Sequence, residues 1–285
     1  MGIGQKRCYS CTHTHMKKKL ILGLCILPFA LYGLFVTTFR PDNDRDWSVD
    51  QAILPSAEFN GDLVTVRNIR NFSYASTTSY TPAYYDKTFN LNDIESLWYV
   101  VEPFSKGGNL AHTFLSFGFK GDHYVSISVE IRKEKGESFS PLKGLFRQYE
   151  IMYVVADEKD VIKLRTNYRN DKVFLYPIRA TTQATRDIFV DMLNRANALT
   201  TKPEFYNTLT NTCTTNIMTH VNKVIPHEIP FNITILVPGQ SDHFAYDLGL
   251  INTDLTFAEA RKRFQINDRA MKYANDPEFS KIIRE

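Results

Sequence analysis

His112 and Cys213 are the residues whose types and surroundings best fit nucleophilic chemistry in this chain. His112 lies in the run Ala-His-Thr-Phe-Leu-Ser-Phe-Gly-Phe, and Cys213 lies in Asn-Thr-Cys-Thr-Thr-Asn. The other cysteines, Cys8, Cys11 and Cys25, all come before position 40. The sequence therefore offers Cys213 no disulfide partner inside the region that follows, and we interpret it as a reactive thiol.

The residues after Cys213 predict a short helix that begins close to the thiol. Apolar side chains recur there at helical spacing before Pro226, at Ile217, Met218, Val221 and Val224. Unpaired N–H groups and the positive end of the helix dipole both favour a thiolate at a helix start. The N–H groups of Cys213 and Thr214 could also receive the oxyanion that forms when sulfur attacks a carbonyl. A buried structural cysteine is the alternative interpretation.

We expect His112 to act as the base. Residues 112–130 predict two strands joined by a turn at residues 120–122, which places His112 opposite Glu130. Cross-strand neighbours approach to about 5 Å, so the carboxylate could hold the imidazole in one tautomer. Cys213, His112 and Glu130 are therefore the predicted catalytic residues. Glu130 could instead pair with Arg132.

The other histidines of this region fit the role of base less well. His220 lies seven residues along the same predicted helix, about 10 Å further up its axis than Cys213. His227 and His243 fall in predicted loops and remain alternatives.

Further polar residues could shape the site or orient a substrate. Residues expected to shape the turn and the oxyanion position are Thr214, Asn211 and Tyr206. Arginines that could orient a phosphate or carboxylate of the substrate are Arg67, Arg70 and Arg132. For Arg67 and Arg70, structural pairing with acidic residues is the alternative interpretation.

The composition fits a folded protein and argues against nucleic-acid binding. The chain has 285 residues, 43% of them hydrophobic, and a net charge of +3 from 34 basic and 31 acidic residues. This length and apolar content suffice for a sizeable core. The charges show no long block of one sign, which is not the footprint of a nucleic-acid-binding protein.

Residues 20–39 form an uncharged stretch long enough to cross a bilayer as a helix. Lysines occupy positions 17–19, whereas the arginines after the stretch are interleaved with aspartates. The positive-inside rule predicts a cytoplasmic segment 1–19, a single transmembrane helix 20–39 and an extracytoplasmic domain 42–285. A cleaved signal peptide is the alternative.

Four residues near the amino terminus have the spacing of zinc ligands: Cys8, Cys11, His13 and His15. Met16, the three lysines and the apolar stretch would make a natural start for a membrane protein, so residues 1–15 could precede the true start. We therefore expect no metal site, and we expect no cofactor.

The domain itself predicts an α+β fold, with an antiparallel sheet followed by helices. Strand-like runs cover residues 63–69, 96–102, 111–119, 124–131, 149–156 and 172–178. Helical periodicity covers residues 183–199, 215–224 and 257–271. We interpret the last of these helices as a surface element that packs on the domain, and a contact with a partner is the alternative.

From about Asp46 to Leu250 the chain resembles the Lnb N-terminal periplasmic domain family. The resemblance runs through Trp47-Ser-Val-Asp-Gln, Val66-Arg-Asn-Ile-Arg-Asn-Phe, Ala111-His-Thr-Phe-Leu-Ser-Phe, Ser128-Val-Glu-Ile-Arg-Lys-Glu, Phe205-Tyr-Asn-Thr-Leu-Thr-Asn-Thr-Cys-Thr-Thr and Pro238-Gly-Gln-Ser-Asp. It implies a permuted papain or NlpC-like core, in which the histidine strand precedes the cysteine helix. His112, Glu130 and Cys213 match the polar positions of that pattern.

The resemblance also implies an activity. It points to an acyltransferase that moves an acyl chain from the diacylglyceryl group of a bacterial lipoprotein to the lipoprotein's own amino-terminal amine. The partners would be membrane lipid, lipoprotein substrates and the bilayer of the inner membrane, with the catalytic domain periplasmic or extracellular. An NlpC-like cell-wall peptidase or amidase is one alternative, and a non-catalytic membrane-tethered binding domain is another.

Overall fold

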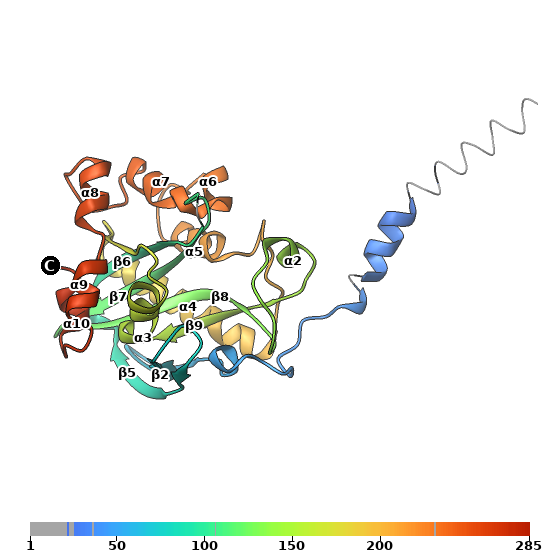
Figure 1. Cartoon of the computed structure of the whole chain (residues 1–285), viewed down its shortest axis with the longest axis horizontal. Helices are drawn as coiled ribbons and strands as arrows, with labels where there is room; N and C mark the ends of the chain where they lie inside the picture. Colours follow the sequence, from blue (N-terminus) through green and yellow to red (C-terminus); the bar gives the residue numbers. More distant parts are fainter. Residues whose placement is uncertain (1–21, 23–25, 36, 106, 231) are drawn as a thin grey trace, which may run out of the picture. The chain divides into compact units, whose positions relative to one another are not determined.

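The computed structural model, shown in Figure 1, describes residues 22, 26–35, 37–105, 107–230 and 232–285. Its contacts divide the chain into two units, Met1–Pro41 and Asp42–Glu285. In the first unit, residues 26–35 are helical. None of the helices in the described part of the chain is both long and apolar enough to cross a bilayer. The predicted span 20–39 and the predicted segment 1–19 lie partly or wholly outside the described residues.

The second unit has an α+β arrangement, in which most of the strands come before most of the helices. Its strands are β1 (Ser56–Asn60), β2 (Leu63–Arg70), β3 (Ser73–Tyr74), β4 (Tyr80–Thr81), β5 (Tyr84–Asn90), β6 (Ile94–Pro103), β7 (Ala111–Phe119), β8 (His123–Arg132), β9 (Glu150–Ala156) and β10 (Phe174–Pro177). Its α-helices are α2 (Pro141–Leu145), α3 (Glu158–Lys163), α4 (Thr182–Thr201), α5 (Cys213–Asn222), α6 (Ile233–Leu236), α7 (Ser241–Asp247), α8 (Phe257–Arg263), α9 (Asn267–Lys272) and α10 (Phe279–Ile282). Short helical turns are η1 (Val49–Gln51), η2 (Leu91–Asp93), the π-helical η3 (Leu164–Tyr168) and η4 (Pro238–Gln240).

One large sheet runs through this unit. Within the described residues its order is β1-β2-β9-β8-β7-β6-β10, and β5 pairs with β2. The neighbours are antiparallel except β2 and β9, which meet in parallel at Arg70 and Ala156. The predicted α+β class with an antiparallel sheet is therefore confirmed, with this parallel contact making the sheet mixed.

The two faces of the sheet pack on different helices because strand side chains alternate. On β7, Leu115 and Phe117 join the core cluster that contains residues of α4 and α5. Phe114, the residue before Leu115, belongs to the opposite face of the sheet. It joins a second core cluster, which contains residues of α3, α9 and α10. The central strands are thus buried on both faces.

The predicted single helix over residues 257–271 is wrong in one respect. The structure divides it into α8 and α9, because the chain between them pairs with the edge of β10. Leu175 N–H donates to Phe264 O at 2.9 Å, and Ile266 N–H donates to Val173 O at 3.0 Å. Ile266 and Ala270 are buried, so the predicted packing role is confirmed.

Gly239 allows α7 to approach the loop that leads into β7. Its N–H donates to Asn109 O at 3.0 Å, and a Cβ at this position would clash with the backbone of Gly108. A side chain here would therefore push η4 and α7 away from the strand that carries His112.

Candidate active site

Helix α5 begins at Cys213, as the sequence predicts. Thr212 caps it, accepting a hydrogen bond from Thr215 N–H at 3.2 Å, while the Thr215 side chain accepts one from Thr212 N–H at 2.7 Å. This reciprocal capping box fixes where the helix starts. The N–H groups of Cys213 and Thr214 fall in the first turn, where the helix itself provides no acceptor.

The hairpin of β7 and β8 brings His112 to Glu130. Phe114 pairs with Ser128, and continuing this register by two residues places His112 opposite Glu130. His112 Nε2 lies 3.3 Å from Glu130 Oε1. The predicted juxtaposition is confirmed.

Ser128 completes a short chain of hydrogen bonds between the histidine and the carboxylate. Its hydroxyl donates to Glu130 Oε1 at 2.8 Å and lies 2.7 Å from His112 Nε2. Because the serine proton goes to Glu130, Nε2 must carry the proton that it donates to Ser128. Nδ1 is then the ring nitrogen that faces Cys213.

Cys213 and His112 shift each other's pKa. Burial acts to raise the pKa of the Cys213 thiol, but a hydrogen bond from His112, the charge of His112 and hydrogen bonds from Thr113 outweigh it and lower the pKa to about 7. Burial acts to lower the pKa of His112, but the charge of Glu130 and hydrogen bonds with Cys213 and Glu130 raise it to about 9. Between these values the pair exists as thiolate and imidazolium.

Glu130 stays ionised although burial favours its neutral form. The charge of His112, a hydrogen bond from His112 and the charges of Arg165 and Arg70 hold its pKa well below the usual range. Arg165 Nη2 donates to Glu130 Oε1 at 3.0 Å, and its Nε donates to buried Glu102 at 2.5 Å. Neither Arg165 nor Glu102 was among the residues predicted for the site.

Thr113 was also missed. It hydrogen-bonds Cys213 through its backbone and side chain and lies on the opposite face of β7 from His112, with its Oγ1 3.1 Å from Thr214 Oγ1. Its position directly after His112 was the available signal, because α5 packs against β7.

Cys213, His112 and Glu130 line a cavity of about 330 Å³, which we call the thiol cavity. Tyr206, Arg70 and Arg165 also line it. It is a mixed surface, in which charged groups stand next to the apolar residues Phe104, Ala111, Val129 and Phe139.

The other predicted site-shaping residues lie around this cavity. Burial and the charge of Cys213 raise the pKa of Tyr206, so its hydroxyl stays protonated. Asn211 supports the turn before α5: its side chain donates to Phe205 O at 2.9 Å and accepts from Asn216 at 2.8 Å. Thr214 lies on α5, 3.7 Å from the sulfur through its Oγ1.

Of the three predicted substrate-orienting arginines, the structure brings Arg70 to the cavity. It is buried and forms a two-fold pair with Asp160, at 2.9 and 3.1 Å. Arg67 instead lies on the surface, paired with Glu58 and Asp86. For both residues the alternative of structural pairing is confirmed.

Arg132 contacts the segment before β1 and not Glu130. It donates to Gln51 O at 3.0 Å and to Ala52 O at 2.8 Å. It is absent from the lining of the thiol cavity among the described residues.

The remaining histidines lie away from the thiol. His220 is buried on α5 between Tyr153 and Asp191, at 2.6 Å from each. His227 is exposed, and His243 stacks on Phe257 at 4.3 Å between ring centroids. None of them lines the thiol cavity as described here.

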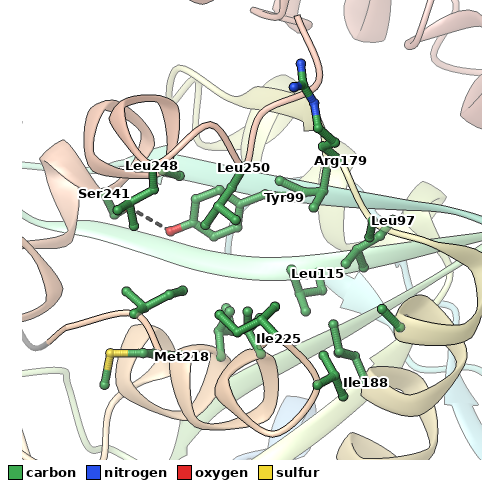
Figure 2. A pocket seen from close by; sticks show the side chains of 18 of the residues that line it. Leu97, Tyr99, Leu115, Arg179, Ile188, Met218, Ile225, Ser241, Leu248 and Leu250 are labelled. Atoms are coloured by element: carbon green, nitrogen blue, oxygen red, sulfur yellow. Dashed lines mark hydrogen bonds between the residues drawn. The ribbon is translucent and has the colours of Figure 1, made fainter. Parts of the chain in front are cut away.

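A second cavity, of about 290 Å³, lies along α5, and we call it the apolar cavity. Figure 2 shows side chains from strands and helices pointing toward one another around it, including Tyr99, Leu115, Met218 and Leu248. Thr214 and Ile217 of α5 line it as well. Cys213 therefore has a mixed cavity on one side and, one residue further along, an apolar one.

A thiol at a helix start that faces a histidine held by a carboxylate is the arrangement used by cysteine-dependent enzymes. The chain belongs to the Lnb N-terminal periplasmic domain family, whose model matches residues 80–239. This match covers more than half of the chain and includes all three predicted catalytic residues. Family membership indicates a periplasmic location.

No match is found among curated proteins or among solved structures. No cluster of metal-ligating side chains occurs in the described part of the chain. The four candidate zinc ligands at positions 8, 11, 13 and 15 lie outside the described residues.

Proposed function

We propose that the chain is a thiol-dependent acyltransferase of the bacterial envelope that works through a thioester on Cys213. The observation that carries this proposal is the pairing of Cys213 with His112. With a thiol pKa of about 7 and a histidine pKa of about 9, the nucleophile and its acid are both ready at neutral pH. Residues 20–39 would anchor the domain to the inner membrane.

In the first half-reaction the Cys213 thiolate attacks the carbonyl carbon of a lipid ester. The oxyanion that forms can accept hydrogen bonds from the N–H groups of Cys213 and Thr214. The ester C–O bond then breaks, and the His112 imidazolium gives its Nδ1 proton to the departing glycerol oxygen. The acyl group remains on sulfur as a thioester.

In the second half-reaction an amine attacks the thioester. His112, now neutral, takes a proton from the amine, the C–S bond breaks, and the thiolate returns. Glu130 and Ser128 keep Nε2 protonated, so Nδ1 is the nitrogen that exchanges protons in both directions. The product is an amide.

Apolar side chains at the rim of the thiol cavity support a substrate that lies in a membrane. Phe104 and Phe139 line the cavity, contact each other at 6.2 Å between ring centroids, and are each 42% exposed. Leu142 and Phe146, which follow Phe139 in the sequence, are 65% and 61% exposed. Exposed apolar groups grouped beside a reactive site favour contact with lipid.

A second candidate is an NlpC-like cell-wall peptidase or amidase. The charged lining of the thiol cavity, with Arg165, Arg169 and Asp171, favours a polar peptide as substrate. The chemistry would be the same up to the thioester, which water instead of an amine would then open.

The test uses the full-length chain in detergent and a synthetic lipopeptide that carries a diacylglyceryl cysteine with a free amine. An acyltransferase moves one acyl chain to the amine, so the intact mass stays the same while fragment masses show the chain on nitrogen. Cys213→Ala is the matched control. A muropeptide digest offered to the same protein tests the peptidase.

Each outcome decides between the candidates. Cleaved muropeptide with unchanged lipopeptide would reject the acyltransferase in favour of the peptidase. If the lipopeptide lost an acyl chain to water, the protein would be a lipid hydrolase and not an acyltransferase. If neither substrate reacted and a thiol probe did not label Cys213, both enzyme candidates would be rejected in favour of a non-catalytic binding domain.

A further inference from the structure

We propose that the apolar cavity holds one hydrocarbon chain of the acyl group while its carbonyl reacts at Cys213. This inference rests on the proposed acyltransfer and names where the chain of the substrate lies. The cavity is bounded by β6 and β7 on the sheet side and by α4, α5 and α7 on the other (Figure 2).

The cavity begins next to the nucleophile. Thr214, which follows Cys213, lines it, and so does Ile217, one helical turn after Cys213. Residues four apart lie on the same face of a helix, so a chain attached to the sulfur would pass over Ile217. Thr113 hydrogen-bonds the sulfur and lies 3.1 Å from Thr214, so this threonine pair stands between the sulfur and the cavity.

Arg179 lies among the lining residues, and the hydroxyls of Tyr99, Ser241 and Thr214, which also line the cavity, already have partners within the protein. The Tyr99 hydroxyl donates to Ser241 Oγ at 2.8 Å, and Ser241 donates to Pro238 O at 2.6 Å, as the dashed line in Figure 2 shows for the first pair. A polar ligand would have to break these bonds, whereas a hydrocarbon chain leaves them intact. The remaining lining is mostly aliphatic, including Leu97, Leu115 and Ile188.

The strand register limits the length of chain that fits. Thr113, which contacts the lining residue Thr214 and pairs with Val101, marks the end of the cavity nearest the sulfur. The lining residue Leu97, which pairs with Phe117, marks the other end along the sheet. Four residues of strand β7 separate these levels, a distance of about 13 Å. With C–C bonds of about 1.52 Å at angles near 111°, an all-trans hydrocarbon chain advances about 1.25 Å per bond, so the cavity matches roughly ten bonds. We expect acyl chains of medium length to gain most from it.

Ala184 offers a way to block the far end. It lies in the first turn of α4, lines the cavity and is partly exposed, so a larger side chain there disturbs the core little. Ala184→Trp would fill the cavity, and Leu97→Phe is a second variant from the sheet side. Met271→Trp, at an exposed position outside the lining, is the matched control.

The kinetic experiment follows nitrophenol release from p-nitrophenyl butanoate, octanoate and dodecanoate by the full-length chain, with the thioester on Cys213 checked by intact mass. We expect the unmodified protein to prefer dodecanoate over butanoate in acylation rate. Ala184→Trp should lower that ratio by about tenfold or more, because pocket contacts with even single methylenes change such ratios strongly. Met271→Trp should keep it.

A binding experiment separates this inference from the proposed function. In Cys213→Ala protein, which cannot form a thioester, the fluorescent probe dansyl-undecanoic acid should bind, and the added Ala184→Trp should weaken binding about tenfold or more. If the unmodified protein forms no thioester but the probe binds as described, the acyltransferase proposal fails and the cavity assignment stands. If thioester forms yet Ala184→Trp and Leu97→Phe leave both the chain-length ratio and probe binding unchanged, the cavity assignment is overturned.

Discussion

Two histidines of this domain, His112 and His220, each contact a carboxylate, yet their pKa values move in opposite directions. The pKa of His112 rises to about 9, because the charge of Glu130 and hydrogen bonds with Cys213 and Glu130 outweigh burial. The pKa of His220 falls, because burial and the charges of Lys223 and Arg195 outweigh its bond with Asp191. The acid partner alone therefore does not decide which histidine becomes charged.

The difference lies in what the second ring nitrogen meets. His112 faces a thiol that can ionise near neutral pH, so the two charges stabilise each other. His220 faces the Tyr153 hydroxyl, whose pKa burial raises, so that group stays neutral. His112 also opens onto the thiol cavity, whereas His220 is 2% exposed. We interpret the network of His112 as one for proton transfer and the network of His220 as one that holds α5 against the sheet.

The largest effect should come from removing the nucleophile or its base. Cys213→Ala and His112→Ala should each abolish acyl transfer to the lipopeptide, because no thioester can form without a thiolate. Both side chains touch the cavity, so thermal unfolding should change little. The fragment masses of the lipopeptide measure acyl transfer, and a melting curve measures thermal unfolding. If either variant kept its activity, the proposed difference between a catalytic His112 and a structural His220 would be rejected.

The titration of the thiol offers a sharper comparison. The rate of Cys213 alkylation by iodoacetamide should rise with a midpoint near pH 7 in the unmodified protein. In His112→Gln the midpoint should move toward the ordinary thiol value of 9.0, which makes alkylation at pH 7 roughly 50-fold slower. In His220→Gln the midpoint should stay near 7. Equal midpoints in all three proteins would contradict the assigned ion pair.

Much of this site could be predicted from the sequence, because it depends on interactions between residues that are close together in the chain. Strand alternation and a three-residue turn fix the register of a hairpin, so His112 opposite Glu130 could be predicted. The helix start at Cys213 could be predicted in the same way, from helical spacing and a threonine cap. The roles of these residues as catalysts stay predictions.

The missed parts depend on long-range packing. Arg165 reaches Glu130 from η3, through a connection that crosses the sheet, and nothing periodic in the sequence announces it. The break between α8 and α9 likewise comes from hydrogen bonds to a strand about ninety positions earlier. Pairings of this kind are set by the fold as a whole, which local spacing does not encode.

Glu130→Gln should produce an intermediate effect. The amide keeps the shape and can still accept from Ser128, but it removes the charge that raises the pKa of His112. We expect the acyl-transfer rate to fall about 100-fold and the upper limb of its pH profile to move to lower pH. Arg165 keeps Glu102 as a partner, so folding should survive. An unchanged pH profile would assign Glu130 a purely structural role.

The smallest effect on chemistry should come from His220→Gln, and its cost should appear in stability instead. The variant disturbs the Tyr153 and Asp191 contacts, so the free energy of unfolding should fall by about 1–3 kcal/mol, measured in urea. His243→Gln, at an exposed position, is the control.

The lowered pKa of His220 should also make the free energy of unfolding depend on pH. The pKa of His220 in the folded state lies below the ordinary histidine value of 6.5, so the unfolded chain binds the proton more readily. The stabilising contribution of neutral His220 is therefore present above pH 6.5 and lost as pH falls through the lowered pKa. Urea unfolding at pH 7.5 and 5.5 should therefore show a loss on acidification that is smaller in His220→Gln. An equal loss in both proteins would mean that His220 is not held neutral.

Asn216 links the two networks, because its side chain contacts Tyr153 at 3.1 Å and also contacts Asn211 in the turn before Cys213. A shifted alkylation midpoint of Cys213 in His220→Gln would show that the two networks communicate through Asn216.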